Sequence, residues 1–401
     1  MKNLQYFLFF LFIFCSKDID DPNGETTNPV EEPKPEETIV VSSEASSNYT
    51  GSFIQFFANT AVDPPLTYTF DDVATTKIIY RTENEKGEDR NASGVLLFPK
   101  TAPYKGIVSL QHGTIQNDSG APSNSYLGNN EYTLGVILAS TGYFVLMPDY
   151  LGYVESNDQL HPYEHRTSLA ITAYDFLNAG IAYLSKQKIE IPKPLYLIGY
   201  SEGGGATLAL HQYIESKGTF EIKKSYAGAG NYDKTETAKT IFQTQDSLPF
   251  MGVYLWVLDF YNRHYNSLNR SWSTYLNEPF AIRIDEISPI NSYVPDSIIS
   301  LNPQELLKSE FVDGVLSGND TAFLAVLKDN DLNDWSPKAP IDLYHGTEDN
   351  FVFPFNSINA KEQLNQNGGD VSYYPIEGKN HLEAALPFYL SVIKALNSNT
   401  P

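Results

Sequence analysis

The amino-acid sequence predicts an α/β fold: a mostly parallel central sheet with helices on both faces and an inserted helical cap. Three observations favour this class. Short apolar runs suited to strands alternate with stretches of helical periodicity, which is the pattern of βαβ units. Several of the short runs are apolar at nearly every position, as in parallel strands buried on both faces. One long stretch breaks the alternation and predicts the insertion.

The alternation begins with a hairpin, because two β-rich runs flank a polar turn at 85–88. Gly106–Leu110 and Tyr143–Met147 are continuous apolar runs and predict buried strands. Later runs of the same kind predict the rest of the sheet. We expect strands at 76–81, 93–98, 106–110, 143–147, 195–198, 224–227, 341–344 and 371–374.

Helices are expected between these strands. The clearest covers Ser168–Leu184, where apolar residues such as Ala173 and Leu177 recur at helical spacing. Further helices are expected at 132–140, 206–216 and 357–365.

The stretch from about Asn231 to Trp335 contains no strong strand signal. Connections in such folds usually span ~2–6 residues, so an excursion of roughly a hundred residues predicts an inserted subdomain. It lies between two strands of the sheet, and we therefore expect a cap over the strand ends.

Composition excludes several classes of partner and site. The 401 residues carry a formal net charge of −22 at pH 7, and the sequence lacks the basic stripe that a nucleic-acid binder needs. A single cysteine excludes an intramolecular disulfide and a thiolate metal cage. Because no His/Asp cluster has the spacing of metal ligands, we expect no metal.

The first residues predict export. Leu4–Phe14 form an apolar run behind Lys2, too short to span a bilayer and typical of a signal peptide. Cys15 ends this run and an acidic stretch follows, which resembles the lipoprotein signals of the Bacteroidetes. The resemblance implies a lipid anchor at Cys15 and a place at the outer membrane or cell surface of a Gram-negative bacterium. An ordinary secretory signal, and hence a secreted or periplasmic protein, is the alternative.

A tether is expected after the signal. Residues 16–47 are rich in Pro, Glu, Thr and Ser, so they cannot bury enough apolar surface to offset the entropy of ordering. The domain organisation that we expect is a signal at 1–15, a disordered acidic tether at 16–47 and one domain at 48–401, with the cap at about 231–335.

The sharpest motif is Gly199-Tyr200-Ser201-Glu202-Gly203. It follows a predicted strand and opens a predicted helix, which is the setting of a nucleophile elbow. Gly199 and Gly203 suit a sharp turn that neighbouring chain segments approach closely. We therefore expect Ser201 to be a nucleophile.

A serine hydroxyl needs a base. Most histidines are poorly placed; His211, for example, lies ~15 Å along the helix axis from Ser201. His381 follows the last predicted strand, at the edge of the sheet where loops carry chemistry. Asp349, in the loop leaving strand 341–344, is the expected acid that orients it, and Glu348 is the alternative.

A developing oxyanion needs donors. The backbone N–H of Glu202 is expected to supply one, since it follows the nucleophile. Thr114, in the loop after strand 106–110, is the candidate for the other.

Together these motifs resemble the secretory lipase branch of the α/β-hydrolases. The resemblance runs from about Thr76 to the C-terminus, and its segments are Gln111-His112-Gly113-Thr114, Pro148-Asp149-Tyr150-Leu151-Gly152, His161-Pro162-Tyr163 and the Ser201 motif. It implies hydrolysis of a lipid or small-molecule carboxyl ester through an acyl-enzyme, without a cofactor.

Three other functions stay open. The chain could be a carbohydrate esterase acting on acetyl or feruloyl groups, a serine peptidase of the same fold, or a non-catalytic surface lipoprotein that only binds. The sequence indicates neither the acyl preference nor the oligomeric state.

Overall fold

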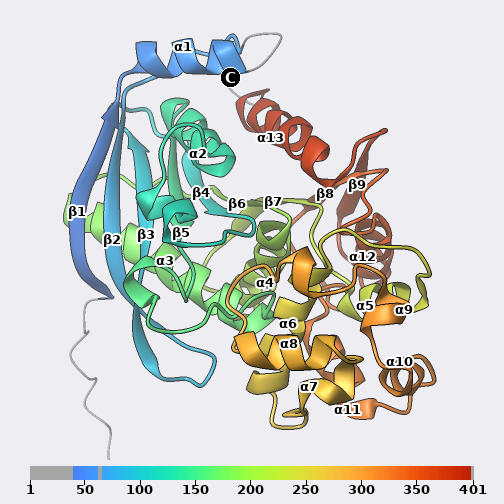
Figure 1. Ribbon diagram of the computed structural model, residues 1–401. Coiled ribbons are helices and arrows are strands. Elements are labelled where there is room, and N and C mark those ends of the chain that lie inside the picture. Colours follow the sequence, from blue (N-terminus) through green and yellow to red (C-terminus); the bar gives the residue numbers. More distant parts are fainter. Residues whose placement is uncertain (1–38, 62–65, 399–401) are drawn as a thin grey trace, which may run out of the picture. The chain divides into compact units, whose positions relative to one another are not determined.

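The computed structural model describes residues 39–61 and 66–398 (Figure 1). Its sheet has the strand order β1-β2-β3-β5-β4-β6-β7-β8-β9. Pairing is antiparallel from β1 through β3 to β5, and parallel from β5 through β4 to β9. The strands are β1 (Val40–Tyr49), β2 (Val73–Glu83), β3 (Asp89–Pro99), β4 (Gly106–Gln111), β5 (Tyr143–Pro148), β6 (Leu195–Tyr200), β7 (Ile222–Gly228), β8 (Ile341–Gly346) and β9 (Val371–Ile376).

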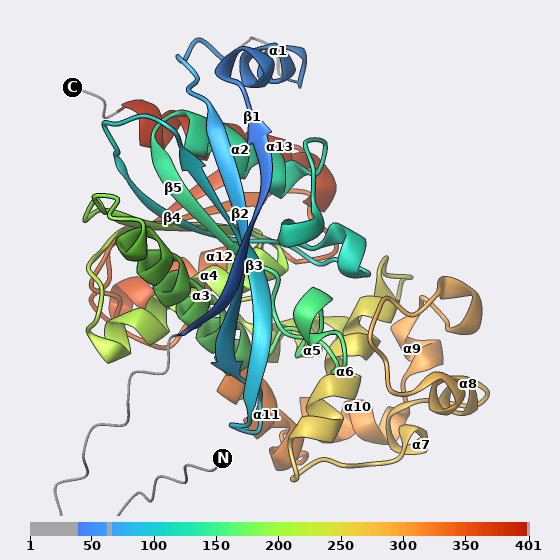
Figure 2. The same cartoon turned by 90° about the vertical axis from the view of Figure 1, so that its left-hand side faces the viewer.

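Helices cover both faces of this sheet (Figures 1 and 2). α1, α2 and α13 lie on one face, and α3, α4 and α12 lie on the other. Their bounds are α1 (Gly51–Ala61), α2 (Asn130–Ser140), α3 (Arg166–Lys186), α4 (Glu202–Lys217), α12 (Phe355–Gln366) and α13 (His381–Ser398). The mostly parallel α/β prediction is confirmed, as are the predicted leading hairpin and the four predicted helices.

Side chains of the central strands alternate between two apolar cores. In β5, Val145 and Met147 pack with α2 and α13, whereas Phe144 and Leu146 pack with α3. All four are fully buried. Burial on both faces explains why these strands are apolar at nearly every position.

The predicted tether boundary at residue 47 is wrong, because β1 begins at Val40. β1 pairs with β2 at the edge of the sheet, and most of its side chains are exposed. Polar contacts support the pairing: the Ser47 backbone N–H donates to Thr75 Oγ1 at 2.8 Å. β1 is a polar edge strand held mainly by backbone pairing, so its sequence lacks the apolar pattern that marks the inner strands. The signal, Cys15 and the tether up to residue 38 lie outside the described residues.

The chain between β7 and β8 forms helices around a separate apolar core. Only helices and their connections occur there, and Figure 2 shows them grouped beside the sheet. They are α5 (Lys234–Gln243), α6 (Met251–His264), α7 (Trp272–Tyr275), α8 (Phe280–Ile287), α9 (Pro303–Leu306), α10 (Ser309–Leu316) and α11 (Thr321–Asn330). We call this group the cap. No helix in the described ranges is both long and apolar enough to cross a membrane.

Candidate active site

Ser201 occupies a strained turn between β6 and α4. Its backbone has φ 59° and ψ −125°, in a region that a residue with a Cβ rarely adopts. The turn is held from both sides: the Ser201 N–H donates to the Gly228 carbonyl at 2.9 Å, and the Gly204 N–H donates to the Ser201 carbonyl at 2.8 Å. These two hydrogen bonds hold the strained turn in place. The turn presents the Ser201 hydroxyl beyond the end of the strand.

The glycines around Ser201 are required by close backbone packing. A Cβ on Gly199 would overlap the Gly203 carbonyl, and a Cβ on Gly203 would overlap the Gln111 carbonyl. Gly113 lies beside the turn without such an overlap, because a Cβ there would be 3.3 Å from the Tyr200 carbonyl oxygen and 3.7 Å from Ser201 Cβ. The loop after β4 is thereby brought against the elbow.

His381 and Asp349 lie in a hydrogen-bonded line with Ser201. His381 Nε2 is 2.9 Å from Ser201 Oγ, and its Nδ1 is 2.6 Å from Asp349 Oδ2. His381 opens α13 and Asp349 follows β8, so three separate elements meet at the carboxyl end of the sheet. Glu348, the alternative acid, is exposed, and the two ring nitrogens of His381 contact Asp349 and Ser201 instead.

Three further groups contact the Asp349 carboxylate. The backbone N–H groups of Phe351 and Val352 donate to Oδ1 at 3.0 and 2.9 Å, and His345 Nε2 lies 3.3 Å from Oδ2. Burial raises the pKa of Asp349, but hydrogen bonds from His345 and His381 outweigh it and lower the pKa to about 2. Asp349 is therefore ionised at neutral pH and fixes the orientation of the His381 ring.

The two candidate oxyanion donors both lie close to Ser201. Glu202 is the first residue of α4, where a backbone N–H has no acceptor within the helix. Thr114 follows the glycine that packs against Ser201, and its hydroxyl is 2.7 Å from the Tyr163 hydroxyl. Both residues are thus next to the nucleophile, and Tyr163 adds a contact that sequence reasoning missed.

The side chain of Glu202 has an environment that the sequence did not indicate. It is 2% exposed and its Oε1 lies 2.6 Å from His161 Nε2. The other ring nitrogen of His161 is 2.8 Å from the Leu151 carbonyl. The His161-Pro162-Tyr163 motif was the available signal, and its residues contact both Glu202 and Thr114.

A cavity of about 670 Å³ opens above Ser201. The cap closes one side of it, where the Phe250 ring packs on Phe351 at 4.4 Å between centroids, and Phe351 packs edge-on against His381 at 4.9 Å. Its lining comprises Gly113, Thr114, Gln116, Asn130, Glu131, Tyr200, Ser201, Phe250, Val253, Tyr293, Phe351, His381, Leu382, Ala385 and Tyr389. The nucleophile and its base therefore face a space large enough for a small organic substrate.

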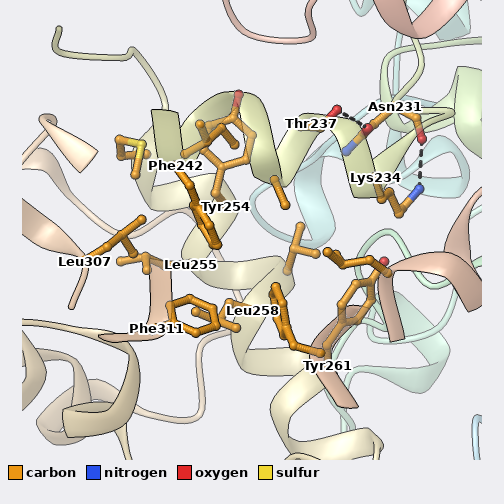
Figure 3. A pocket seen from close by; sticks show the side chains of 16 residues that line it. Asn231, Lys234, Thr237, Phe242, Tyr254, Leu255, Leu258, Tyr261, Leu307 and Phe311 are labelled. Atoms are coloured by element: carbon orange, nitrogen blue, oxygen red, sulfur yellow. Dashed lines mark hydrogen bonds between the residues drawn. The ribbon is translucent and has the colours of Figure 1, made fainter. Parts of the chain in front are cut away.

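A second cavity, of about 80 Å³, lies within the cap (Figure 3). Side chains of α5, α6, α10 and α11 line it, and α6 contributes Leu255 and Leu258. At its polar end, Lys234 Nζ donates to the Asn231 carbonyl at 2.9 Å and also pairs with Glu164. Neither Ser201, His381 nor Asp349 lines this cavity, so the cavity above Ser201 is the candidate reaction site.

No group of three or more potential metal ligands occurs among residues 39–61 and 66–398. The chemistry that the described site supports is nucleophilic attack by a serine, assisted by a base and backbone donors.

Comparisons with known proteins identify the family and support the fold. A family model for secretory lipases matches residues 119–393. Among solved structures, a Legionella pneumophila protein superimposes with a TM-score of 0.79 and 23% identity, covering 90% of this chain and 99% of its own. The rice cell wall degrading esterase LipA from Xanthomonas oryzae gives 0.77 and 23%, covering 91% and 98%. Candida antarctica lipase A gives 0.65 and 17%, covering 90% and 82%. No match was found among curated protein sequences.

Proposed function

The chain belongs to the secretory lipase family and is an exported carboxylic ester hydrolase of the α/β-hydrolase fold, and we propose that it acts through a Ser201–His381–Asp349 triad and an acyl-enzyme. The observation that carries this proposal is the hydrogen-bonded line from Ser201 Oγ through the His381 ring to Asp349 Oδ2. Each contact has the length that proton transfer and ring orientation require.

In the first half of the reaction, His381 Nε2 takes the proton of Ser201 as Oγ attacks the ester carbonyl carbon. The negative charge of Asp349 stabilises the imidazolium that forms. His381 then gives its proton to the departing alcohol oxygen, and the acyl group remains on Ser201. In the second half, His381 removes a proton from water, the hydroxide attacks the acyl carbonyl, and the acid is released as Ser201 regains its proton.

The oxyanion of both tetrahedral intermediates is held by backbone N–H groups near the turn. Glu202 contributes the N–H at the start of α4, where the helix dipole also favours negative charge. Thr114 contributes the second donor from the loop that packs against Ser201 through Gly113.

The test is hydrolysis of p-nitrophenyl esters from acetate to palmitate by the purified full-length chain. Wild type is expected to hydrolyse part of the series, and Ser201→Ala to reduce kcat by about 10⁴-fold or more. Ser119→Ala, which removes an exposed serine outside the cavity, is the matched control. Retention of activity by Ser201→Ala would overturn the proposed mechanism.

We also propose that Cys15 carries a lipid anchor that attaches the enzyme to a membrane. The support is the position of Cys15 at the end of the apolar run Leu4–Phe14, followed by acidic residues. Cys15→Ser is expected to move the enzyme from the membrane fraction to the soluble fraction of the cell. An unchanged distribution would contradict the anchor and leave the hydrolase proposal untouched.

A further inference from the structure

The cavity above Ser201 has two chemically different walls. The cap and the loop after β8 contribute an apolar wall that contains Phe250, Val253 and Phe351. The loop after β4 and the start of α2 contribute polar side chains instead, namely Gln116, Asn130 and Glu131. Because β4 and β8 lie on opposite sides of β6, the two walls flank the nucleophile. A substrate bound at Ser201 would contact both.

Glu131 places a carboxylate beside the reaction centre. A Cβ on Gly113 would lie 3.4 Å from Glu131 Oε1 and 3.7 Å from Ser201 Cβ, so the carboxylate and the nucleophile flank this glycine. Glu131 is half-buried in the first turn of α2. Its position is set by Tyr389, a buried side chain of α13 whose hydroxyl donates to Oε1 at 3.1 Å.

This carboxylate has unused acceptor capacity. A carboxylate can accept about four hydrogen bonds. The Tyr389 hydroxyl is the only side-chain donor to Glu131 in the described parts of the chain, and no Lys, Arg or His there pairs with it. An unpaired negative charge near a developing oxyanion disfavours the oxyanion, and hydrogen-bond donors that solvate the charge reduce this effect. The polar wall therefore suits a substrate that brings donors.

Neighbouring amides indicate which donors these are. Gln116, which lines the cavity, accepts the Tyr293 backbone N–H through Oε1 at 3.0 Å, and its amide NH₂ has no acceptor among the described residues. Asn130 also lines the cavity and is exposed. Amide donors next to a carboxylate acceptor match hydroxyl groups, which both donate and accept, better than they match a single cation.

We propose that Glu131 binds substrate hydroxyl groups, and that the enzyme prefers esters of polyhydroxylated alcohols, such as saccharides, over esters of plain alkyl alcohols. The inference rests on the proposed function of Ser201. The acyl group then lies against the apolar wall, and the hydroxylated alcohol lies along Gln116, Asn130 and Glu131.

The test compares two esters with the same acyl group, methyl 6-O-butanoyl-glucoside and butyl butanoate. Wild type is expected to have the higher kcat/KM for the sugar ester. Glu131→Leu is expected to lower the sugar-to-alkyl ratio of kcat/KM about 10- to 100-fold, mainly through KM, because a charged hydrogen bond to substrate is lost. Glu131→Gln has nearly the same shape and is expected to lower the ratio less. Glu155→Gln, which removes an exposed carboxylate outside the cavity, should leave the ratio unchanged.

Two results would overturn the inference. An unchanged ratio in both Glu131 variants would show that the carboxylate does not contact the alcohol. A preference of wild type for butanoylcholine over both other esters, lost in Glu131→Leu, would assign Glu131 to a cation instead. Either result leaves hydrolysis by Ser201 intact, whereas persistence of activity in Ser201→Ala would contradict the proposed function itself.

Discussion

Oε1 of Glu202 and Nε2 of His161 lie 2.6 Å apart and must share a proton. The Leu151 carbonyl, 2.8 Å from Nδ1, can only accept, so Nδ1 carries a hydrogen. Neutral imidazole then has a lone pair at Nε2, and its contact with a carboxylate needs a second proton between the two groups. Both side chains are almost fully buried. The shared proton therefore links α4, the helix that follows Ser201, to the loop that contains His161 and Tyr163.

Glu202→Ala should therefore destabilise the elbow. The variant leaves Nε2 of His161 buried without a partner, which costs about 1–3 kcal/mol of unfolding free energy. Glu202→Gln should retain most of the stability, because its amide can donate to Nε2. Urea unfolding of both variants, with Glu155→Ala as the exposed control, measures the difference. Equal stability of the Ala and Gln variants would show that the hydrogen bond to Nε2 has no structural role.

Gly203→Ala should abolish the active conformation. The added methyl group would overlap the Gln111 carbonyl, a backbone atom that cannot move without displacing β4. We expect loss of ester hydrolysis together with a large loss of stability, of at least about 3 kcal/mol. Gly314→Ala in α10 is the matched control, because its nearest neighbour would be 3.5 Å away and alanine favours a helix. A stable, active Gly203→Ala enzyme would contradict the described packing.

Lowering the pH should reduce the free energy of unfolding, because Asp349 becomes protonated. Its pKa of about 2 in the folded state lies below the ordinary value of 3.8, so the unfolded chain binds this proton more tightly. The resulting stabilisation is present above pH 3.8 and is lost as the pH falls towards 2, and its size is about 2 kcal/mol. Asp349→Asn should lack this part of the pH dependence when urea unfolding at pH 5 and pH 2 is compared. Glu348→Gln, at the exposed neighbour, should keep it.

Features set by local sequence could be predicted. The elbow depends on glycines within a few residues of Ser201, and the buried strands depend on apolar runs, so both are visible in the chain. Chain order selected His381 and favoured Asp349, with Glu348 as the alternative, since parallel strands bring their carboxyl ends to one edge. The geometry then distinguished Asp349 from its exposed neighbour Glu348.

Contacts between distant polar side chains could not be predicted. Glu202 meets His161, and Glu131 meets Tyr389, across 41 and 258 residues of sequence respectively. A single sequence contains no pattern for such pairs, because their partners are set by the packing of separate helices and loops. The edge strand β1 was missed for a related reason: its pairing uses the backbone, and its side chains are largely polar and exposed.

The most direct test of the triad is covalent labelling of the full-length enzyme with a fluorophosphonate, read by intact mass and peptide mapping. The triad predicts one label, on Ser201, that is absent from Ser201→Ala and forms much more slowly in His381→Ala, because the base that activates the hydroxyl has been removed. An enzyme that hydrolyses esters but remains unlabelled, or is labelled at another serine, would contradict the role given to Ser201.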